Sequence, residues 1–250
     1  MGNLDETSKL LEEYLLLHYG TPDQILPWSF GPKEALEFPR RCVADRIRPV
    51  EGARALELGC AVGRACFELS EKCREVIGID FSASFIEQAK ELAKDRKVQF
   101  SSADEGDLTR EHSYELESRF HPERVHFEVG DATQLRPDLG EFDIVLACNL
   151  LCRVPYPQAV LHRLPDLVKP GGQLLITSPY TWMQEYTPRR FWLGGFHRGG
   201  DEVRSLQSIT KALQNDFELD SVEDMPFLIR EHSRKFQWCV SQSSRWIRKS

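Results

Sequence analysis

The feature that most constrains the fold is a repeated order of apolar strand, tight turn and helix through the middle of the chain. Five short apolar runs predict strands, at 53–58, 75–80, 125–129, 142–147 and 173–178. Three stretches with helical spacing predict helices between them, at 64–72, 82–95 and 158–167. Strands that alternate with helices form a parallel sheet with helices on both faces. The sequence therefore predicts an α/β fold.

The flanking segments predict further helices and two closing strands. Apolar periodicity predicts the helices at 10–20, 35–48 and 206–214. The strands expected at 217–224 and 235–241 have no helix between them, which suggests an antiparallel hairpin at one edge of the sheet. Residues 21–32 are expected to form an ordered loop. Residues 101–124 are highly charged and lack a clear period, so they are interpreted as an insertion.

No internal repeat, low-complexity tract or linker divides the sequence. We therefore expect one domain over residues 1–250. Its parts are an N-terminal helical cap (1–50), a central core (51–178) and a C-terminal part (179–250).

The composition excludes several classes of protein. The formal net charge is −7, whereas a nucleic-acid-binding surface is usually basic. No apolar run approaches the roughly 20 residues of a membrane span, and the acidic N-terminus lacks the features of a signal peptide. The 7 cysteines contain no CxxC pair and are expected to be small buried hydrophobic residues instead of metal ligands. We therefore expect a cytoplasmic protein that binds no nucleic acid, no membrane and no metal.

The turn after the first strand carries the main signal of a binding site. It reads ELGCAVG, in which Gly59 and Gly63 allow a sharp turn and a close approach of a ligand to the main chain. Two glycines at this spacing also occur in a simple strand-to-helix turn. Asp80 strengthens the interpretation as a binding site, because it ends the next strand, where a carboxylate can accept both ribose hydroxyls of an adenosine.

Charge separates two kinds of adenosine-containing ligand at such a turn. A dinucleotide pyrophosphate requires glycine where Ala61 stands, and Glu57 would repel its phosphates. The Glu57 carboxylate instead suits the cationic amino-methionine end of S-adenosylmethionine. Asp131 follows the next strand, where the adenine amine needs an acceptor, and Phe81 is placed to lie against the adenine ring. Asn149, after the fourth strand, is expected beside the transferable methyl group.

These motifs together resemble those of class I S-adenosylmethionine-dependent methyltransferases. ELGCAVG, GIDFS, GDA, FDIVLACN and VKPGGQLLI appear in this order between residues 53 and 178. The resemblance implies a Rossmann-like, seven-stranded sheet of order 3-2-1-4-5-7-6, with six parallel strands and one antiparallel strand. It makes residues 51–178 the cofactor-binding core and residues 179–250 the acceptor loop and closing strands. The residues expected to contact the cofactor are Tyr19, Glu57, Gly59, Cys60, Ala61, Gly63, Arg64, Asp80, Phe81, Ser82, Asp131, Ala132, Asn149 and Leu150.

An aromatic block follows the fifth strand and contains SPYTW at 178–182 and WLGGF at 192–196. Loops at this place lie over the carboxyl ends of the strands, where ligands bind in α/β sheets. The rings can alternatively cap the sheet. As a group they predict a small, aromatic-lined pocket for the methyl acceptor. Its expected residues are Tyr14, Tyr180, Trp182, Arg189, Trp192 and Phe196.

Together with YLLLHYG at 14–20 and RKFQ at 234–237, this block is similar to the methyltransferase domain of the ovothiol-biosynthesis enzymes. The resemblance covers nearly the whole chain and implies N-methylation of the imidazole ring of 5-thiohistidine (4-mercaptohistidine) to give ovothiol A. In that family the domain is commonly fused behind an iron-dependent sulfoxide synthase, so a separate synthase is an expected partner. Cys152 stands where the family usually has an acid, which leaves open another imidazole or thiol acceptor.

Methyl transfer is an in-line displacement, so alignment of the nucleophile carries much of the catalysis. A neutral imidazole nitrogen has a free lone pair and does not need a strong base. Asn149, Arg153 and Tyr180 are the candidates for orienting the acceptor, and Arg153 or Arg189 for binding its carboxylate. His18 is a candidate base, although a single histidine on a helix is more often structural.

Two other functions stay open. A protein or RNA methyltransferase would share the cofactor motifs, but the acidic balance and the aromatic loop favour a small acceptor. A non-catalytic methyltransferase-like subunit would stabilise a partner enzyme, although the intact acids and glycines favour cofactor binding.

Overall fold

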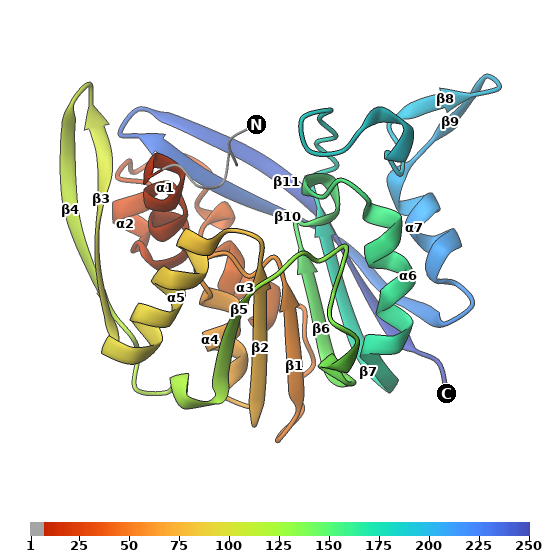
Figure 1. The fold of residues 1–250 in the computed structure, drawn as a ribbon. Helices are drawn as coiled ribbons and strands as arrows, with labels where there is room; N and C mark the ends of the chain where they lie inside the picture. Colours follow the sequence, from red (N-terminus) through yellow and green to blue (C-terminus); the bar gives the residue numbers. More distant parts are fainter. Residues whose placement is uncertain (1–7) are drawn as a thin grey trace.

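The computed structural model describes residues 8–250, and a seven-stranded sheet forms its centre (Figure 1). The strands of this sheet are β1 (Arg54–Leu58), β2 (Glu75–Asp80), β5 (Val125–Val129), β6 (Phe142–Cys148), β7 (Val168–Ser178), β10 (Phe217–His232) and β11 (Lys235–Arg248). They lie in the order β10-β11-β7-β6-β1-β2-β5. All seven predicted strands are present, and the two closing strands are longer than predicted.

The sheet has the predicted order of strands. When only its own strands are numbered along the chain, β5 is third, β6 fourth, β10 sixth and β11 seventh, so the order reads 3-2-1-4-5-7-6 from the β5 edge. The neighbours from β5 to β7 are parallel, β11 is antiparallel to β7, and β10 is antiparallel to β11. β10 therefore runs parallel to the first five strands. The expected six parallel strands and one antiparallel strand are confirmed.

Helices cover both faces of the sheet, because successive residues of a strand point to opposite sides. Ala55 of β1 packs into one core together with α4 (Arg64–Ser70) and α5 (Ala83–Asp95). Leu56, the next residue, packs into a second core with residues of two other helices. These are α6 (Pro157–Leu167) and α7 (Ser205–Leu213). All four helices begin and end within two residues of their predicted limits.

The N-terminal segment begins with the expected helix, α1 (Ser8–Tyr19). The loop predicted for residues 21–32 contains the short helix α2 (Pro22–Ile25). Its first turn is stabilised by a capping box, in which Thr21 and Gln24 each bond the backbone of the other. The prediction of a loop was wrong for this turn.

The helix predicted for residues 35–48 is shorter in the structure. A 3₁₀ turn, η2 (Lys33–Ala35), comes first, and α3 (Phe38–Ala44) follows after a break. Pro39 lies in the first turn of α3. Proline is tolerated there but would remove a hydrogen bond from a longer helix, which explains the break.

The charged segment 101–124 is mostly a hairpin and not an irregular insertion. Its strands are β3 (Lys97–Glu105) and β4 (Leu108–Glu115), and β3 packs against α1. Val98 and Phe100 are buried, whereas β4 is exposed or half-buried along its whole length and therefore shows no apolar alternation. The remaining short elements are η3 (Pro122–Arg124), η4 (Pro137–Leu139), η5 (Leu151–Arg153), η6 (Arg189–Phe191), β8 (Phe196–Arg198) and β9 (Asp201–Val203).

The hairpin of β10 and β11 extends beyond the end of β7. β11 pairs with β7 only from Gln242 to Ile247, and Gln242 lies opposite Ser178, the last residue of β7. Because the two strands are antiparallel, residues 235–241 continue past the carboxyl end of β7. The same hairpin contacts α1 and α3 through β10.

The acidic N-terminal residues 1–7, which bear on targeting, lie outside the described part of the chain. Within residues 8–250, no helix is long and apolar enough to cross a membrane.

Gly63, directly before α4, lies against the side chain of Phe127 in β5. Its φ is +87°, and a Cβ there would lie 2.5 Å from Cζ of Phe127. Gly63→Ala is therefore expected to lower the free energy of unfolding by about 2–5 kcal/mol, from backbone strain and overpacking together. Gly171→Ala is the matched control, because Gly171 has a φ of +77° and nothing within 4 Å. Urea denaturation measures both, and equal losses would contradict the packing explanation.

Candidate functional site

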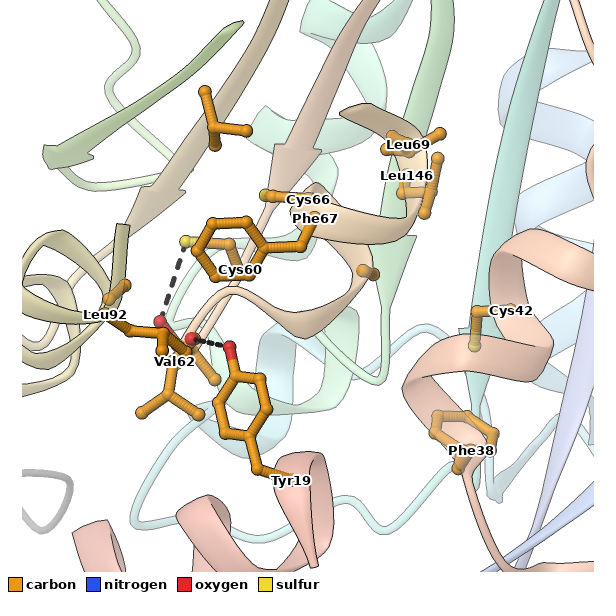
Figure 2. Close-up of a cluster of buried hydrophobic side chains, with 14 of the residues drawn as sticks. Tyr19, Phe38, Cys42, Cys60, Val62, Cys66, Phe67, Leu69, Leu92 and Leu146 are labelled. Carbon is orange, nitrogen blue, oxygen red and sulfur yellow. Dashed lines mark hydrogen bonds between the residues drawn. The ribbon is translucent and has the colours of Figure 1, made fainter. Parts of the chain in front are cut away.

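The turn between β1 and α4 is held from two sides. The N–H groups of Gly59 and Cys60 donate to the carbonyl oxygen of Ile79 in β2, at 2.8 and 3.1 Å. Tyr19 of α1 donates its hydroxyl to the carbonyl oxygen of Val62, at 2.5 Å (Figure 2). The side chain of Tyr19 is buried, so this bond fastens the N-terminal helices to the turn.

Asp80, the last residue of β2, joins the same turn to the start of α5. Its Oδ2 accepts the N–H of Ala61 at 2.8 Å, and its Oδ1 accepts the N–H of Ser82 at 2.9 Å. A carboxylate oxygen can accept a second hydrogen bond, so the predicted ribose contact stays possible. Ser82 is buried and caps α5 by accepting the N–H of Phe85. Phe81 is 62% exposed and presents an apolar ring that a flat ligand can cover.

Glu57 lies on a buried face of β1, close to the turn. It is 4% exposed, and its carboxylate accepts a hydrogen bond from the thiol of Cys66 at 3.0 Å. Burial raises the pKa of Glu57 to about 8 and the pKa of the Cys60 thiol to about 11. At neutral pH the carboxyl group is therefore mostly protonated, and a cation beside it would favour the ionised form.

Three further predicted cofactor residues follow the ends of β5 and β6. Oδ1 of Asp131 accepts hydrogen bonds from the N–H and the hydroxyl of Thr133, both at 2.7 Å, which fixes the carboxylate after β5. Ala132 beside it is buried. Leu150 lies against the turn, because a Cβ on Gly59 would be 3.0 Å from its Cδ1. The predicted residues thus come from neighbouring strand ends.

The side chain of Arg64 bonds residues of α4 and of the β3–β4 hairpin. Its guanidinium donates to Glu68 at 2.6 and 2.8 Å and to the hydroxyl of Tyr114 at 3.0 Å. It also lies 5.4 Å from the ring of Phe120. These contacts tie α4 to the β3–β4 hairpin and engage the guanidinium in a buried ion pair with Glu68, and a contact of Arg64 with the cofactor stays a prediction.

His18 is not suited to the predicted role of a base. Burial and the nearby guanidinium of Arg64 lower the pKa of His18 to about 3. The ring therefore stays neutral at physiological pH and binds a proton only weakly. Its Nδ1 is buried without a hydrogen-bond partner among residues 8–250, and the ring lies between Tyr14 and Tyr19. The structural alternative for this histidine fits better.

Asn149 and Tyr180 follow β6 and β7, and both adopt a left-handed backbone conformation with a φ of 53°. Oδ1 of Asn149 accepts the hydroxyls of Thr177 and Ser241, at 3.0 and 2.7 Å. The hydroxyl of Tyr180 donates to Gln242 at 3.1 Å, and burial raises its pKa to about 12. Thr177, Ser241 and Gln242 were not predicted, because no motif in the sequence distinguishes these polar strand residues from others.

The aromatic block packs largely on itself. The rings of Trp182 and Trp192 stack with centroids 6.3 Å apart, and Trp182 donates to the hydroxyl of Ser205 in α7 at 2.9 Å. The guanidinium of Arg189 lies 4.3 Å from the ring of Trp192 and 5.7 Å from that of Phe196. These contacts anchor the loop on α7, in agreement with the alternative that the rings cap the sheet.

Of the other predicted acceptor residues, Tyr14 lies apart from this block, whereas Tyr180 packs against the same core as Trp182. Tyr14 lies 5.0 Å from Phe85 of α5 and packs against the first core, whereas Tyr180 packs against the second. Arg153 is exposed, with its guanidinium 4.4 Å from the ring of Tyr186. The predicted pocket residues are therefore distributed on two sides of the strand ends.

A groove of about 560 Å³ lies elsewhere, between α5 and β5, with Lys90, Lys94 and His126 among its lining residues. It opens near the amino end of β5, whereas Asp131 follows the carboxyl end. The groove is therefore not part of the candidate site.

The segment that carries these strand ends matches a known family. Residues 56–174 match the family model of a methyltransferase domain. They form a class I S-adenosylmethionine-dependent methyltransferase domain. The ubiquinone biosynthesis O-methyltransferase of Coxiella burnetii is 26% identical over 129 residues, 52% of this chain and 44% of that protein. The protein of the same name from Klebsiella pneumoniae is 26% identical over 136 residues, 54% of this chain and 46% of that protein. The chain thus spans about half the length of these curated relatives.

Solved structures share the methyltransferase fold. The N-methyltransferase NodS from Bradyrhizobium japonicum WM9, in complex with S-adenosyl-L-homocysteine, has a TM-score of 0.51 at 15% identity, covering 85% of this chain and 84% of NodS. A structure concerned with the conversion of a disulfide bond into a thioacetal group during echinomycin biosynthesis has a TM-score of 0.54 at 16% identity. It covers 97% of this chain and 93% of that chain. At these identities the likeness shows the Rossmann-like fold alone.

The strand ends of the methyltransferase domain fit S-adenosylmethionine. Gly59 has no side chain and a φ of +75°, Asp80 presents a carboxylate, and Phe81 presents an exposed ring. The buried carboxyl of Glu57 suits a positively charged amino group, which favours its ionised form, whereas the ionised form would be unfavourable beside a pyrophosphate. The set of groups therefore favours a cationic adenosine ligand over a dinucleotide.

Asp80 is expected to determine cofactor affinity. Asp80→Ala removes the acceptor of two backbone N–H groups and of the ribose hydroxyls. We expect S-adenosylhomocysteine to bind about ten- to a hundredfold more weakly, which corresponds to roughly 1.5–3 kcal/mol. Asp80→Asn keeps one acceptor oxygen and should lose less, and Asp166→Ala on α6 serves as a control. Calorimetric titration measures the Kd, and equal values for wild type and Asp80→Ala would contradict the assignment.

Cofactor binding is also expected to depend on pH through Glu57. A cationic amino group beside Glu57 lowers its pKa from about 8, so binding releases a proton at neutral pH. The affinity for S-adenosylhomocysteine should therefore rise with pH, by at most about tenfold per unit, and level off once the free carboxyl is ionised. Calorimetry in buffers of different protonation enthalpy counts the released protons. Glu57→Gln should abolish this release, and an affinity of the wild type that does not change with pH would refute the linkage.

Proposed function

We propose that the chain transfers a methyl group from S-adenosylmethionine to the imidazole ring of 5-thiohistidine, with ovothiol A as the product. The observation that carries this proposal concerns His18, the candidate base, and Tyr180, a candidate for orienting the acceptor. The pKa of His18 is lowered to about 3 and that of Tyr180 is raised to about 12, so neither exchanges a proton readily near neutral pH. Such a site suits an acceptor atom that already carries a free lone pair.

The chemistry divides between the cofactor and the residues of the chain. S-adenosylmethionine, when bound, supplies a methyl group on a positively charged sulfur. Asp80, Glu57 and Phe81 would hold its ribose, amino group and adenine. Asn149 and Tyr180 would orient the acceptor at the neighbouring strand ends. Because methyl transfer requires an in-line approach, this alignment supplies much of the rate enhancement.

5-Thiohistidine meets these requirements. Its ring nitrogen can attack without first losing a proton, and a thiolate on the ring increases the electron density there. Its carboxylate has two candidate partners, Arg153 and Arg189, which are exposed on the segments that follow β6 and β7. The resemblance of the aromatic block to the ovothiol family supports the same acceptor. The expected partners are this small molecule and a separate sulfoxide synthase, with no nucleic acid or membrane.

The curated relatives favour a second candidate, O-methylation of a hydroxyl group, because they are named ubiquinone biosynthesis O-methyltransferases. A hydroxyl group reacts well only after it has lost its proton. His18, with a pKa lowered to about 3, would accept that proton poorly. The further alternatives are another imidazole or thiol metabolite, a protein acceptor, and a non-catalytic subunit.

A panel of acceptors tests the proposal. The protein and S-adenosylmethionine are incubated separately with 5-thiohistidine, histidine, ergothioneine, carnosine, a catechol and total protein, and the products are followed by mass. We expect 5-thiohistidine to be methylated fastest, on a ring nitrogen. Histidine lacks the sulfur, and a site that bonds a substrate group can reject an analogue without it by up to about 10⁴-fold.

Two other results of this panel would contradict the proposal. Faster turnover of any other acceptor would overturn 5-thiohistidine as the substrate and leave methyl transfer standing. Turnover of none of them, with S-adenosylhomocysteine still bound, would contradict the proposed activity and favour the non-catalytic subunit.

A further inference from the structure

Two consecutive residues of β11 hold the two strained residues of the acceptor side. Asn149 and Tyr180 each have a φ of 53°, which non-glycine residues rarely adopt. Such conformations persist where surrounding contacts fix them, and they are concentrated at functional sites. Here Ser241 donates its hydroxyl to Asn149, and Gln242 accepts the hydroxyl of Tyr180. β11 therefore fixes the side chains that follow β6 and β7.

The side-chain carbonyl of Asn149 is fully occupied. Its Oδ1 accepts the hydroxyl of Thr177 at 3.0 Å and the hydroxyl of Ser241 at 2.7 Å. The Thr177 oxygen in turn accepts the backbone N–H of Asn149, at 3.0 Å. Thr177 and Ser241 are both 0% exposed, so water cannot replace these bonds. The three residues form a closed hydrogen-bond network.

This network determines which end of the amide is available. In the reverse orientation the N–H groups of the amide would face the two hydroxyls, and the hydroxyl protons would lose their acceptor in a buried place. Oδ1 is therefore held inward. Nδ2 makes no hydrogen bond within residues 8–250 and is not among their buried unpaired atoms. It is thus an accessible donor at the end of β6.

We propose that Ser241 and Thr177 are positioning residues that hold Asn149 as a hydrogen-bond donor toward the methyl acceptor. This inference rests on the proposed function in requiring that a small acceptor binds beside Asn149. It adds that the acceptor group facing Nδ2 must accept a hydrogen bond. A carboxylate, a thiolate or an unprotonated imidazole nitrogen qualifies, whereas a protonated amine does not.

A matched pair of variants at Ser241 tests the role of its hydroxyl. Ser241→Thr keeps the hydroxyl and adds a methyl group. Ser241→Val introduces a side chain of the same size as threonine but without the hydroxyl. Loss of one neutral hydrogen bond to Oδ1 is expected to lower kcat/KM for the acceptor about three- to tenfold in Ser241→Val relative to Ser241→Thr. The Kd of S-adenosylhomocysteine should be the same in both. Equal kcat/KM values, or a loss of S-adenosylhomocysteine affinity confined to Ser241→Val, would overturn the proposal.

A second readout does not require the acceptor to be known. In isotope-labelled protein with S-adenosylhomocysteine bound, the side-chain amide of Asn149 gives a pair of nuclear magnetic resonance signals, identified by their loss in Asn149→Asp. The pair should keep its shifts in Ser241→Thr and move in Ser241→Val. Identical shifts in the two variants would overturn the positioning role. If the signals behave as expected but no acceptor is methylated, the proposed function fails while the positioning of Asn149 stands.

Discussion

The arrangement of the site depends on the carboxylate of Asp80. Its two oxygens accept the backbone N–H groups of Ala61 in the first turn and of Ser82 at the start of α5. One side chain therefore joins two successive strand–helix units at their carboxyl edge. Because these bonds go to the main chain, the turn keeps its shape without polar side chains of its own. Gly59 contributes no side chain to the turn, so a ligand can approach the backbone there.

The sequence was sufficient to predict the buried helices and strands, and insufficient to predict the exposed ones. β1 and β2 are short, mostly apolar and almost wholly buried, and α5 has a clear apolar face, so their limits were predictable. The strand order followed from the resemblance of the turn motifs to those of a known fold. The β3–β4 hairpin was not predictable, since β4 has no buried residue and thus no alternation. Its register depends on pairing with β3.

The cofactor side of the site was easier to predict than the acceptor side for a physical reason. Gly59 directly follows β1 and Asp80 ends β2, so local sequence marks their place. The positions of Arg64 and Asn149 depend on distant partners. Arg64 bonds Tyr114, 50 residues away, and Asn149 bonds Ser241, 92 residues away. No local pattern marks such pairs, because the tertiary fold alone brings them together.

The cofactor side and the acceptor side of the site depend on different strands. This separation bears on how the substrate of such a domain can change during evolution. The groups that fit the cofactor belong to β1, β2 and β5, whereas Asn149 and Tyr180 take their orientation from β11. Within the sheet, β11 pairs with β7 and β10 alone. If Asn149 and Tyr180 orient the acceptor as proposed, mutations along this one strand would reshape acceptor recognition while the residues that fit the methyl donor are inherited unchanged. Descendants of a common ancestor can acquire new substrates in this way without passing through a form that has lost its methyl donor.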